Sequence, residues 1–279
     1  MPPRFLTLVI VAFWMSMTGW VLYKDIWPRW QADSPPPFVI DLADEAQPAL
    51  VHTEWKIFVN GQDQVFHLET WVRFLPKEDS FELNSELWPR IDADGKTAKL
   101  AQFGMYNKLV VSREGELRSF NVRVTEPLPP HNDNDLFKII GNVKGDSLFT
   151  RIVFTNTGLE KPFDPVPIKN RSSVLNPLQP LNRLTNLRPG QKWRMPLVDP
   201  FGQAFSLLVP LSSGYVRYLD AEVLPEVEPL AWKNRDVPCL VVEYQGDEAT
   251  GKTWVREADG LVLRQELTVD GKSLILQRD

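Results

Sequence analysis

The feature that most constrains this fold is an alternation of apolar and polar residues that begins after residue 50 and is interrupted by glycine-bearing turns. A period of two is typical of β-strands, and strands joined by short glycine turns are typical of antiparallel hairpins. No long stretch of this region has a helical period. The sequence therefore predicts a mainly all-β domain over residues 51–279, built on an antiparallel sheet.

The first hairpin is the best specified. Asn60-Gly61 is the strongest two-residue loop signal, and it predicts a register in which Trp55 lies opposite Phe66. The two faces then separate into an apolar core face and a polar solvent face. The core face carries Thr53, Trp55, Ile57, Val59, Phe66 and Leu68, and the solvent face carries His52, Glu54, Lys56, His67 and Glu69.

Three further glycine turns predict three more hairpins. Glu114-Gly115 and Lys144-Gly145-Asp146 each join two alternating segments, and Asp270-Gly271 sets Leu267 opposite Leu274. We expect one buried face at this C-terminal hairpin. Its predicted members are Leu261, Leu263, Leu267, Val269, Leu274 and Leu276.

The turn at residues 258–260 has two interpretations. A three-residue loop with a bulge at Gly260 sets Val255 opposite Leu263, whereas a two-residue loop sets Arg256 there. We favour the bulge.

Residues 162–190 break the alternation, with six prolines and a leucine at every third position from 175 to 187. Pro180 suits the first turn of a short helix that ends near Leu187. Such a segment can lie across the open face of the sheet as a helical, proline-rich plug that contacts a ligand, or it can be a surface crossover with one packed edge. The leucines of this candidate plug are Leu175, Leu178, Leu181, Leu184 and Leu187.

The N-terminus contains nineteen consecutive uncharged residues, from Phe5 to Tyr23. This length is sufficient to cross a hydrocarbon core of about 30 Å, and Trp20, Trp27 and Trp30 mark the predicted exit. We expect residues 1–23 to be an uncleaved transmembrane anchor; a cleaved signal peptide is the alternative. The predicted location is the bacterial inner membrane, crossed once, with the C-terminal domain in the periplasm.

Residues 24–50 follow as a stalk. Pro35, Pro36 and Pro37 favour extended polyproline II geometry, which is typical of a semi-rigid spacer. The acidic residues Asp41 and Asp44 are then expected on a solvated linker face.

Charge and cysteine content exclude several classes of protein. Beyond residue 29 the chain has 28 basic and 35 acidic residues, which excludes nucleic acid as a partner. Cys239 is the single cysteine, so no internal disulfide can form, and its apolar strand predicts a buried, inert thiol. We expect no cofactor.

The C-terminal part of the chain resembles a known family. The segments PLQPLNRLTNLRPGQKWRMPL, YVRYLDAEVLPEV, DVPCLVVEYQG, TWVREADGLVLRQELTVDG and SLILQR follow one another over residues 177–279. In this order they resemble uncharacterised bacterial envelope domains related to the half-barrel lipoprotein carriers (LolA and LolB) and the envelope-stress regulator RseB. The resemblance implies a curved antiparallel sheet of half-barrel type whose concave apolar face holds acyl chains or docks partners, and it supplies no catalytic residue.

One constellation suggests a metal site. The predicted register makes His52 face Glu69 and Glu54 face His67, and two imidazoles with two carboxylates can hold a divalent metal. The alternative is a solvated face with cross-strand charge pairs. We favour the solvated face, with no metal.

The sequence leaves three functions open. We expect an extracytoplasmic binding module for an apolar ligand, such as a lipid or acyl chain, or for an envelope protein partner, and no enzymatic activity. The first alternative is a structural or assembly subunit with a closed core. The second is a metal-dependent enzyme that uses His52, Glu54, His67 and Glu69.

Overall fold

The computed structural model describes residues 4–21, 52–61, 64–90, 103–113, 115–126, 135–168, 180–198, 216–247, 249–269 and 271–279. One helix, α1 (Arg4–Val21), precedes the strands. The strands are β1 (Thr53–Val59), β2 (Gln64–Leu75), β3 (Ser80–Pro89), β4 (Gly104–Ser112), β5 (Leu117–Thr125), β6 (Asp135–Lys144), β7 (Ser147–Phe154), β8 (Glu160–Pro162), β9 (Val166–Pro167), β10 (Lys192–Val198), β11 (Val216–Trp232), β12 (Arg235–Gln245), β13 (Ala249–Arg256), β14 (Val262–Val269) and β15 (Lys272–Arg278).

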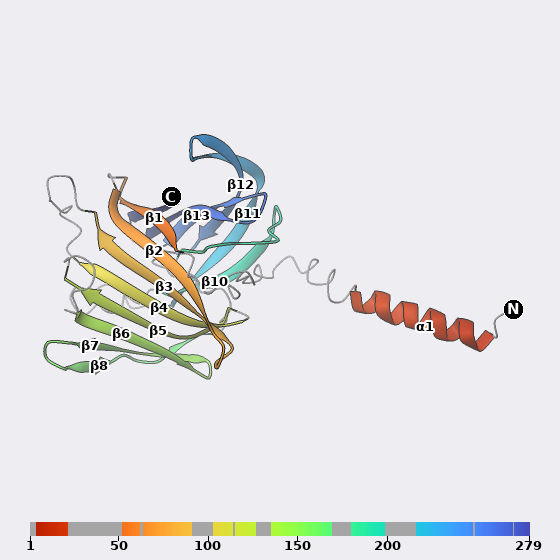
Figure 1. The fold of residues 1–279 in the computed structure, drawn as a ribbon, viewed down its shortest axis with the longest axis horizontal. Coiled ribbons are helices and arrows are strands. Elements are labelled where there is room, and N and C mark those ends of the chain that lie inside the picture. Colours follow the sequence, from red (N-terminus) through yellow and green to blue (C-terminus); the bar gives the residue numbers. More distant parts are fainter. Residues whose placement is uncertain are drawn as a thin grey trace.

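All of these strands belong to one antiparallel sheet. The order is β10-β11-β12-β13-β14-β15-β1-β2-β3-β4-β5-β6-β7-β8, and β9 pairs with β7. Figure 1 shows the sheet strongly bent, with β2 to β8 on one side and β10 to β13 on the other. The end strands β10 and β8 do not pair with each other in the described part of the chain, so the sheet is open, as predicted.

The first and last strands of the chain pair in the middle of the sheet. Trp55 of β1 lies opposite Arg278 of β15, and Val59 opposite Leu274. The pairing continues past the strand, because the amide of Asn60 donates to the carbonyl of Ser273 at 2.8 Å and Asn60 Oδ1 accepts from the Ser273 amide at 3.0 Å. Asn60 is therefore held by β15 as well as by its own turn.

This pairing corrects the predicted register of the first hairpin. Trp55 lies opposite Leu68 rather than Phe66, and the register shifts by one residue between Ile57 and Phe58. Because the change is two residues, the faces are unchanged, and the predicted core face is correct. Trp55, Ile57, Phe66 and Leu68 are buried, while His52 and Glu54 are exposed.

The other hairpins form where the glycine turns predict them. β4 and β5 meet at Gly115, and β6 and β7 meet at Gly145, both with positive φ. At the C-terminus, Leu267 lies opposite Leu274 as expected. A positive φ of 75° at Gly271 is a conformation that glycine adopts without strain.

At the turn before β14, Gly260 has a φ of 73°. The predicted pairing of Val255 with Leu263 is wrong, because a register irregularity between Trp254 and Val255 sets Val255 opposite Val262. In this register, Val262 and Leu263 pack in two different apolar clusters.

The concave face encloses the main apolar cluster, here called the inner core. It joins residues from both sides of the sheet, including Trp55, Ile139 and Leu219, each 0% exposed. Because β1, β6 and β11 all contribute, the bend of the sheet brings distant strands around one cluster.

A second cluster lies on the opposite face of the sheet, and we call it the outer cluster. It consists of Val237, Cys239 and Leu263, with the partly buried Leu230, Trp232, Trp254 and Leu261 packed against it. Cys239 belongs to it, whereas the next residue, Leu240, packs on the inner core; neighbouring side chains of a strand point to opposite faces. The expectation that Leu261 and Leu263 share a face with Leu274 and Leu276 is therefore wrong.

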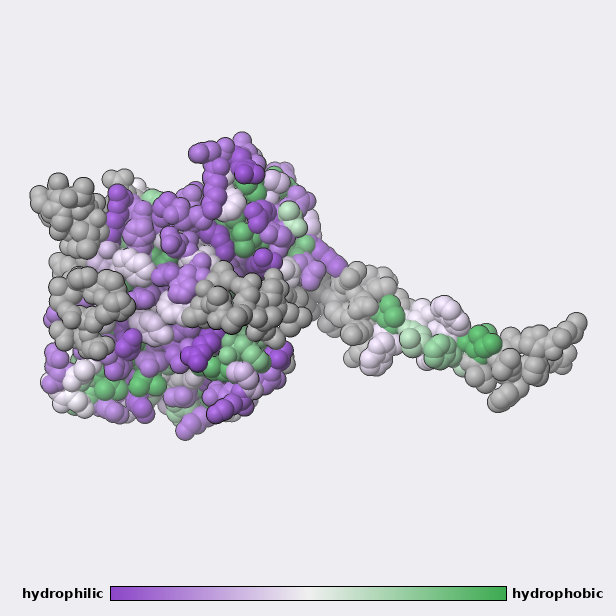
Figure 2. All heavy atoms as spheres, in the orientation of Figure 1, coloured by the Kyte–Doolittle hydropathy of each residue, from purple (hydrophilic) through white to green (hydrophobic). Residues whose placement is uncertain are grey.

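Helix α1 carries exposed apolar side chains, including Phe13, Trp14 and Met15 at 61%, 67% and 70% exposure. Figure 2 shows hydrophobic residues along it, whereas the visible face of the sheet is largely hydrophilic. Among the described residues, no helix has both the length and the apolar character needed to span a membrane, which differs from the transmembrane helix predicted here. The stalk, residues 24–50, lies outside the described residues.

Candidate binding cleft

The hairpin of β11 and β12 projects at one rim of the sheet (Figure 1). A cleft is lined by the tip of this hairpin. The hairpin turns at Lys233-Asn234, since Trp232 lies opposite Arg235. Both turn residues have positive φ, 49° and 62°, the geometry of a tight two-residue loop. Lys233 has no special tolerance for this conformation, so local backbone strain is held at the hairpin tip.

Two adjoining cavities make up this rim cleft. One, of about 490 Å³, lies between residues 231–236 of the tip, residues 277–279 and Lys56. The other, of about 420 Å³, extends to residues 52–54. They share Lys233, Arg278 and Asp279. The charged residues of the rim cleft are Lys56, Lys233, Arg235, Arg278, Glu54, Asp236 and Asp279.

Trp232 forms the aromatic wall of the rim cleft. Its indole Nε1 donates to the backbone carbonyl of Arg278 at 3.1 Å, which fixes the hairpin tip to the end of β15. The Lys233 ammonium and the Arg256 guanidinium lie 4.8 and 5.4 Å from its ring centroid. Cations at this distance are attracted to the face of an indole ring.

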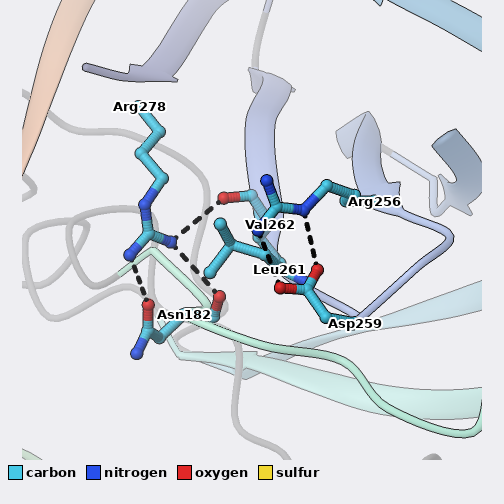
Figure 3. Close-up of polar contacts among 6 residues, drawn as sticks. All are labelled: Asn182, Arg256, Asp259, Leu261, Val262 and Arg278. Carbon is cyan, nitrogen blue, oxygen red and sulfur yellow. Dashed lines mark hydrogen bonds and ion pairs between the residues drawn. The ribbon is translucent and has the colours of Figure 1, made fainter. Parts of the chain in front are cut away.

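Arg278 extends from β15 toward the segment 180–190 (Figure 3). Its Nη2 donates to Asn182 Oδ1 at 2.9 Å and to Thr53 Oγ1 at 3.1 Å. Its Nη1 donates to the carbonyl oxygens of Val262 at 3.2 Å and Asn182 at 3.4 Å. The guanidinium lies 5.3 Å from the ring centroid of Trp55. One side chain thus ties β1, β14 and the segment 180–190 to β15.

Arg256 and Asp259 form a second contact of this rim (Figure 3). Arg256 donates to Asp259 through Nε at 2.8 Å and Nη2 at 2.7 Å, and the Leu261 amide donates to Asp259 Oδ1 at 3.2 Å. The hydrogen bonds from Arg256 lower the pKa of Asp259. Burial, with Arg183 and Arg256 nearby, lowers the pKa of Arg278 to about 10.

The segment 180–190 packs along the start of β14. The Val262 amide donates to the Asn182 carbonyl at 3.1 Å, and the Leu184 amide donates to the Gly260 carbonyl at 2.8 Å. A Cβ on Gly260 would lie 2.5 Å from the Leu184 carbonyl oxygen, so this close approach requires glycine. The segment therefore occupies the edge of β14 beyond the end of β15.

The predicted plug residues are placed in part. Leu184 is buried in the inner core, and Leu181 and Leu187 pack against it. Leu175 and Leu178 lie outside the described residues. The helix expected from Pro180 to Leu187 does not form; instead the backbone of this segment bonds to the turn before β14, as at Arg183, which bridges to Leu261.

Of the two pairs in the metal hypothesis, His52 and Glu69 contact each other as predicted, whereas Glu54 and His67 do not lie opposite each other. Glu54 lies opposite Glu69, and His67 opposite Lys56. His52 Nδ1 contacts Glu69 Oε1 and its ring stacks on Trp71 at 5.1 Å, whereas His67 Nε2 bonds to the amide of Gln64 at 3.2 Å. No metal-binding group of histidine, cysteine and acidic residues occurs in the part of the chain that the structure describes.

Cys239 is 0% exposed, and burial raises the pKa of its thiol to about 11. The thiolate is therefore scarce near neutral pH, as expected of an inert cysteine.

Sequence reasoning did not identify the rim cleft, although one signal was available. Leu274, Leu276 and Arg278 alternate on the apolar face of β15, so a charged residue interrupts a core-facing row. Charged side chains are rarely buried unless they have a structural or binding partner. Lys233-Asn234 gave no comparable signal, because the usual residues of such turns are Asn-Gly or Asp-Gly.

Comparison with known proteins gives one similar structure to report. It is a β-barrel-like protein of a domain of unknown function, DUF1849, from Brucella abortus, with 7% sequence identity and a TM-score of 0.41. The alignment covers 82% of this chain and 95% of that chain. No protein-family model matches the sequence, and no curated protein matches it.

Proposed function

We propose that this protein is a membrane-held binding module of the bacterial envelope, and that its rim cleft receives an extended segment of a protein partner. The observation that carries the proposal is the pair of adjoining cavities that share Lys233, Arg278 and Asp279. A cleft of this size with an aromatic wall suits a peptide segment, and Trp and Arg are enriched among residues that dominate protein interfaces.

The charges of the rim cleft favour a peptide over an acyl chain. Cations and carboxylates are nearly balanced, and the Lys56 ammonium bonds to the Asp279 carboxylate at 2.7 Å. A saturated chain would leave these groups without solvent or partners, at a cost in free energy. On the concave face, side chains such as Ile139 and Leu219 already belong to one packed apolar cluster. We therefore prefer an envelope protein as the partner to the lipid that half-barrel carriers hold.

Helix α1 supports attachment to a membrane. Its described side chains are exposed and mostly apolar, and a helix that is apolar all round is typically buried in protein or lipid. We propose that residues 1–23 hold the protein at the inner membrane, with the sheet in the periplasm. The full chain should stay with membranes after alkaline carbonate washing, and a chain lacking residues 1–23 should not. Release of the full chain would overturn this attachment.

Photo-crosslinking from the hairpin tip tests the partner. Benzoylphenylalanine replaces Arg235 in the full chain, expressed in its own envelope, and adducts are identified by mass spectrometry. The matched control replaces Asn156, an exposed residue of another turn. We expect a discrete protein adduct from position 235 and none from 156.

Two variants connect this adduct to the rim cleft. Trp232→Ala should lower its yield at least about tenfold, as expected for a central aromatic residue. Lys233→Gly should also lower it while leaving the fold intact, because glycine adopts the φ of 49° without strain. No protein adduct, or an adduct that both variants form at full yield, would exclude the proposed function.

A further inference from the structure

We propose that Arg278 is the receptor for a carboxylate that the partner segment presents in the rim cleft. This inference rests on the proposed function and names the chemistry by which the cleft recognises its partner.

The first observation is the set of atoms that Arg278 binds. Within the described residues its hydrogen-bond acceptors are neutral oxygens: two carbonyls, one amide oxygen and one hydroxyl. A half-buried guanidinium forms its strongest contacts with carboxylates, often through two parallel hydrogen bonds. The structure therefore holds Arg278 in position without using its preferred partner.

The second observation is the charge around it. Arg183 and Arg256 both lie close enough to disfavour the charged form of Arg278. Asp259 acts in the opposite direction, but both of its oxygens are bonded to Arg256. An added carboxylate would relieve this repulsion.

The third observation is position. Arg278 is one of the three residues that line both cavities of the rim cleft. Its two longest hydrogen bonds, 3.2 and 3.4 Å, are both made by Nη1. Bonds of this length are near the weak end of the range. Because the guanidinium is planar and moves as one unit, a carboxylate would exchange these two weaker Nη1 bonds for charge-assisted ones as the whole group shifts.

Short peptides provide a direct test. The full chain carries ¹⁵N-labelled arginine, and the Arg278 side-chain signal is assigned by its loss in Arg278→Lys. Three probes are titrated: acetyl-Ala-Ala with a free carboxylate, its C-terminal amide, and acetyl-Ala-Glu-Ala amide. We expect saturable shifts with the carboxylate-bearing peptides and none with the amide control. The peptide that binds more tightly identifies a terminal or a side-chain carboxylate.

Equal shifts with the amide, or no saturable shift with any probe, would overturn the inference. Arg278→Gln separates it from the proposed function, because glutamine keeps a hydrogen-bond donor but no charge. We expect this variant to lower the crosslink from position 235 at least about tenfold, as for removal of one partner of a buried charge pair. If Trp232→Ala removes the adduct and Arg278→Gln does not, the binding function stands and the role of Arg278 is wrong.

Discussion

The inner core and the outer cluster differ in what they hold together. The inner core gathers side chains from both sides of the bent sheet, such as Ile139 of β6 and Leu219 of β11. The outer cluster draws on β11 to β14 and on Leu261, which directly precedes β14. Trp232 belongs to the outer cluster and also lines the rim cleft. The fold therefore depends on one cluster, and the shape of the cleft depends on the other.

This difference predicts that damage to the inner core unfolds the whole domain. Ile139→Ala should lower the free energy of unfolding by about 2–5 kcal/mol, because it leaves a cavity in close-packed surroundings. Urea denaturation followed by tryptophan fluorescence measures the loss. The matched control is Leu159→Ala, at a leucine 60% exposed, which should change stability by less than about 0.5 kcal/mol. Equal losses in the two variants would remove the distinction between core and surface.

Damage to the outer cluster should be smaller and local. Leu263→Ala should cost about 2 kcal/mol, at the low end for a buried leucine, because a small cluster near a hairpin can collapse around the gap. The local effect is read from Cys239, whose thiol should react with iodoacetamide faster in this variant than in Ile139→Ala at matched stability. A faster reaction in Ile139→Ala would show that the two clusters are not separate.

The smallest expected loss of stability concerns the contact between Arg256 and Asp259 at the rim of the sheet. The pKa of Asp259 is lowered in the folded protein. Its pair with Arg256 therefore stabilises the fold at pH values above the ordinary aspartate pKa. This stabilisation is lost as the pH falls through the lowered pKa of the folded state. Asp259→Asn should therefore cost up to about 1 kcal/mol at pH 7. The difference in free energy of unfolding between variant and wild type should disappear toward pH 2, as measured by urea titrations at several pH values. A difference that does not change with pH would assign the effect to hydrogen bonding alone.

Two similar turns show how far the sequence determines the fold. Asp270-Gly271 sets Leu267 opposite Leu274 as predicted, whereas Asn60-Gly61 does not set Trp55 opposite Phe66. The reason is that Asn60 also bonds to Ser273, 213 residues away in the chain. Local turn propensity predicts a register only where no distant strand competes for the same backbone groups.

The candidate site was less predictable than the fold for the same reason. The alternation identified the faces of β1 and β2, which depend on neighbouring residues. The rim cleft is formed by Lys56, Trp232 and Arg278, which come from three strands that the sequence separates widely. In the sequence, the only sign of the rim cleft is Arg278, which interrupts the row of leucines on β15. The predicted pairing of Glu54 with His67 is wrong because it depends on the register of the hairpin of β1 and β2, in which Glu54 lies opposite Glu69.

The central pairing of β1 with β15 also has a consequence for biosynthesis. Among the strands of the described residues, β1 is translated first and its neighbour β15 last, so one edge of β1 stays unpaired until β15 has been made. Contacts between such distant segments form slowly, and an open strand edge invites pairing with other chains. The growing chain must therefore be kept from pairing with its copies, and with its own later hairpins, until β15 has been made.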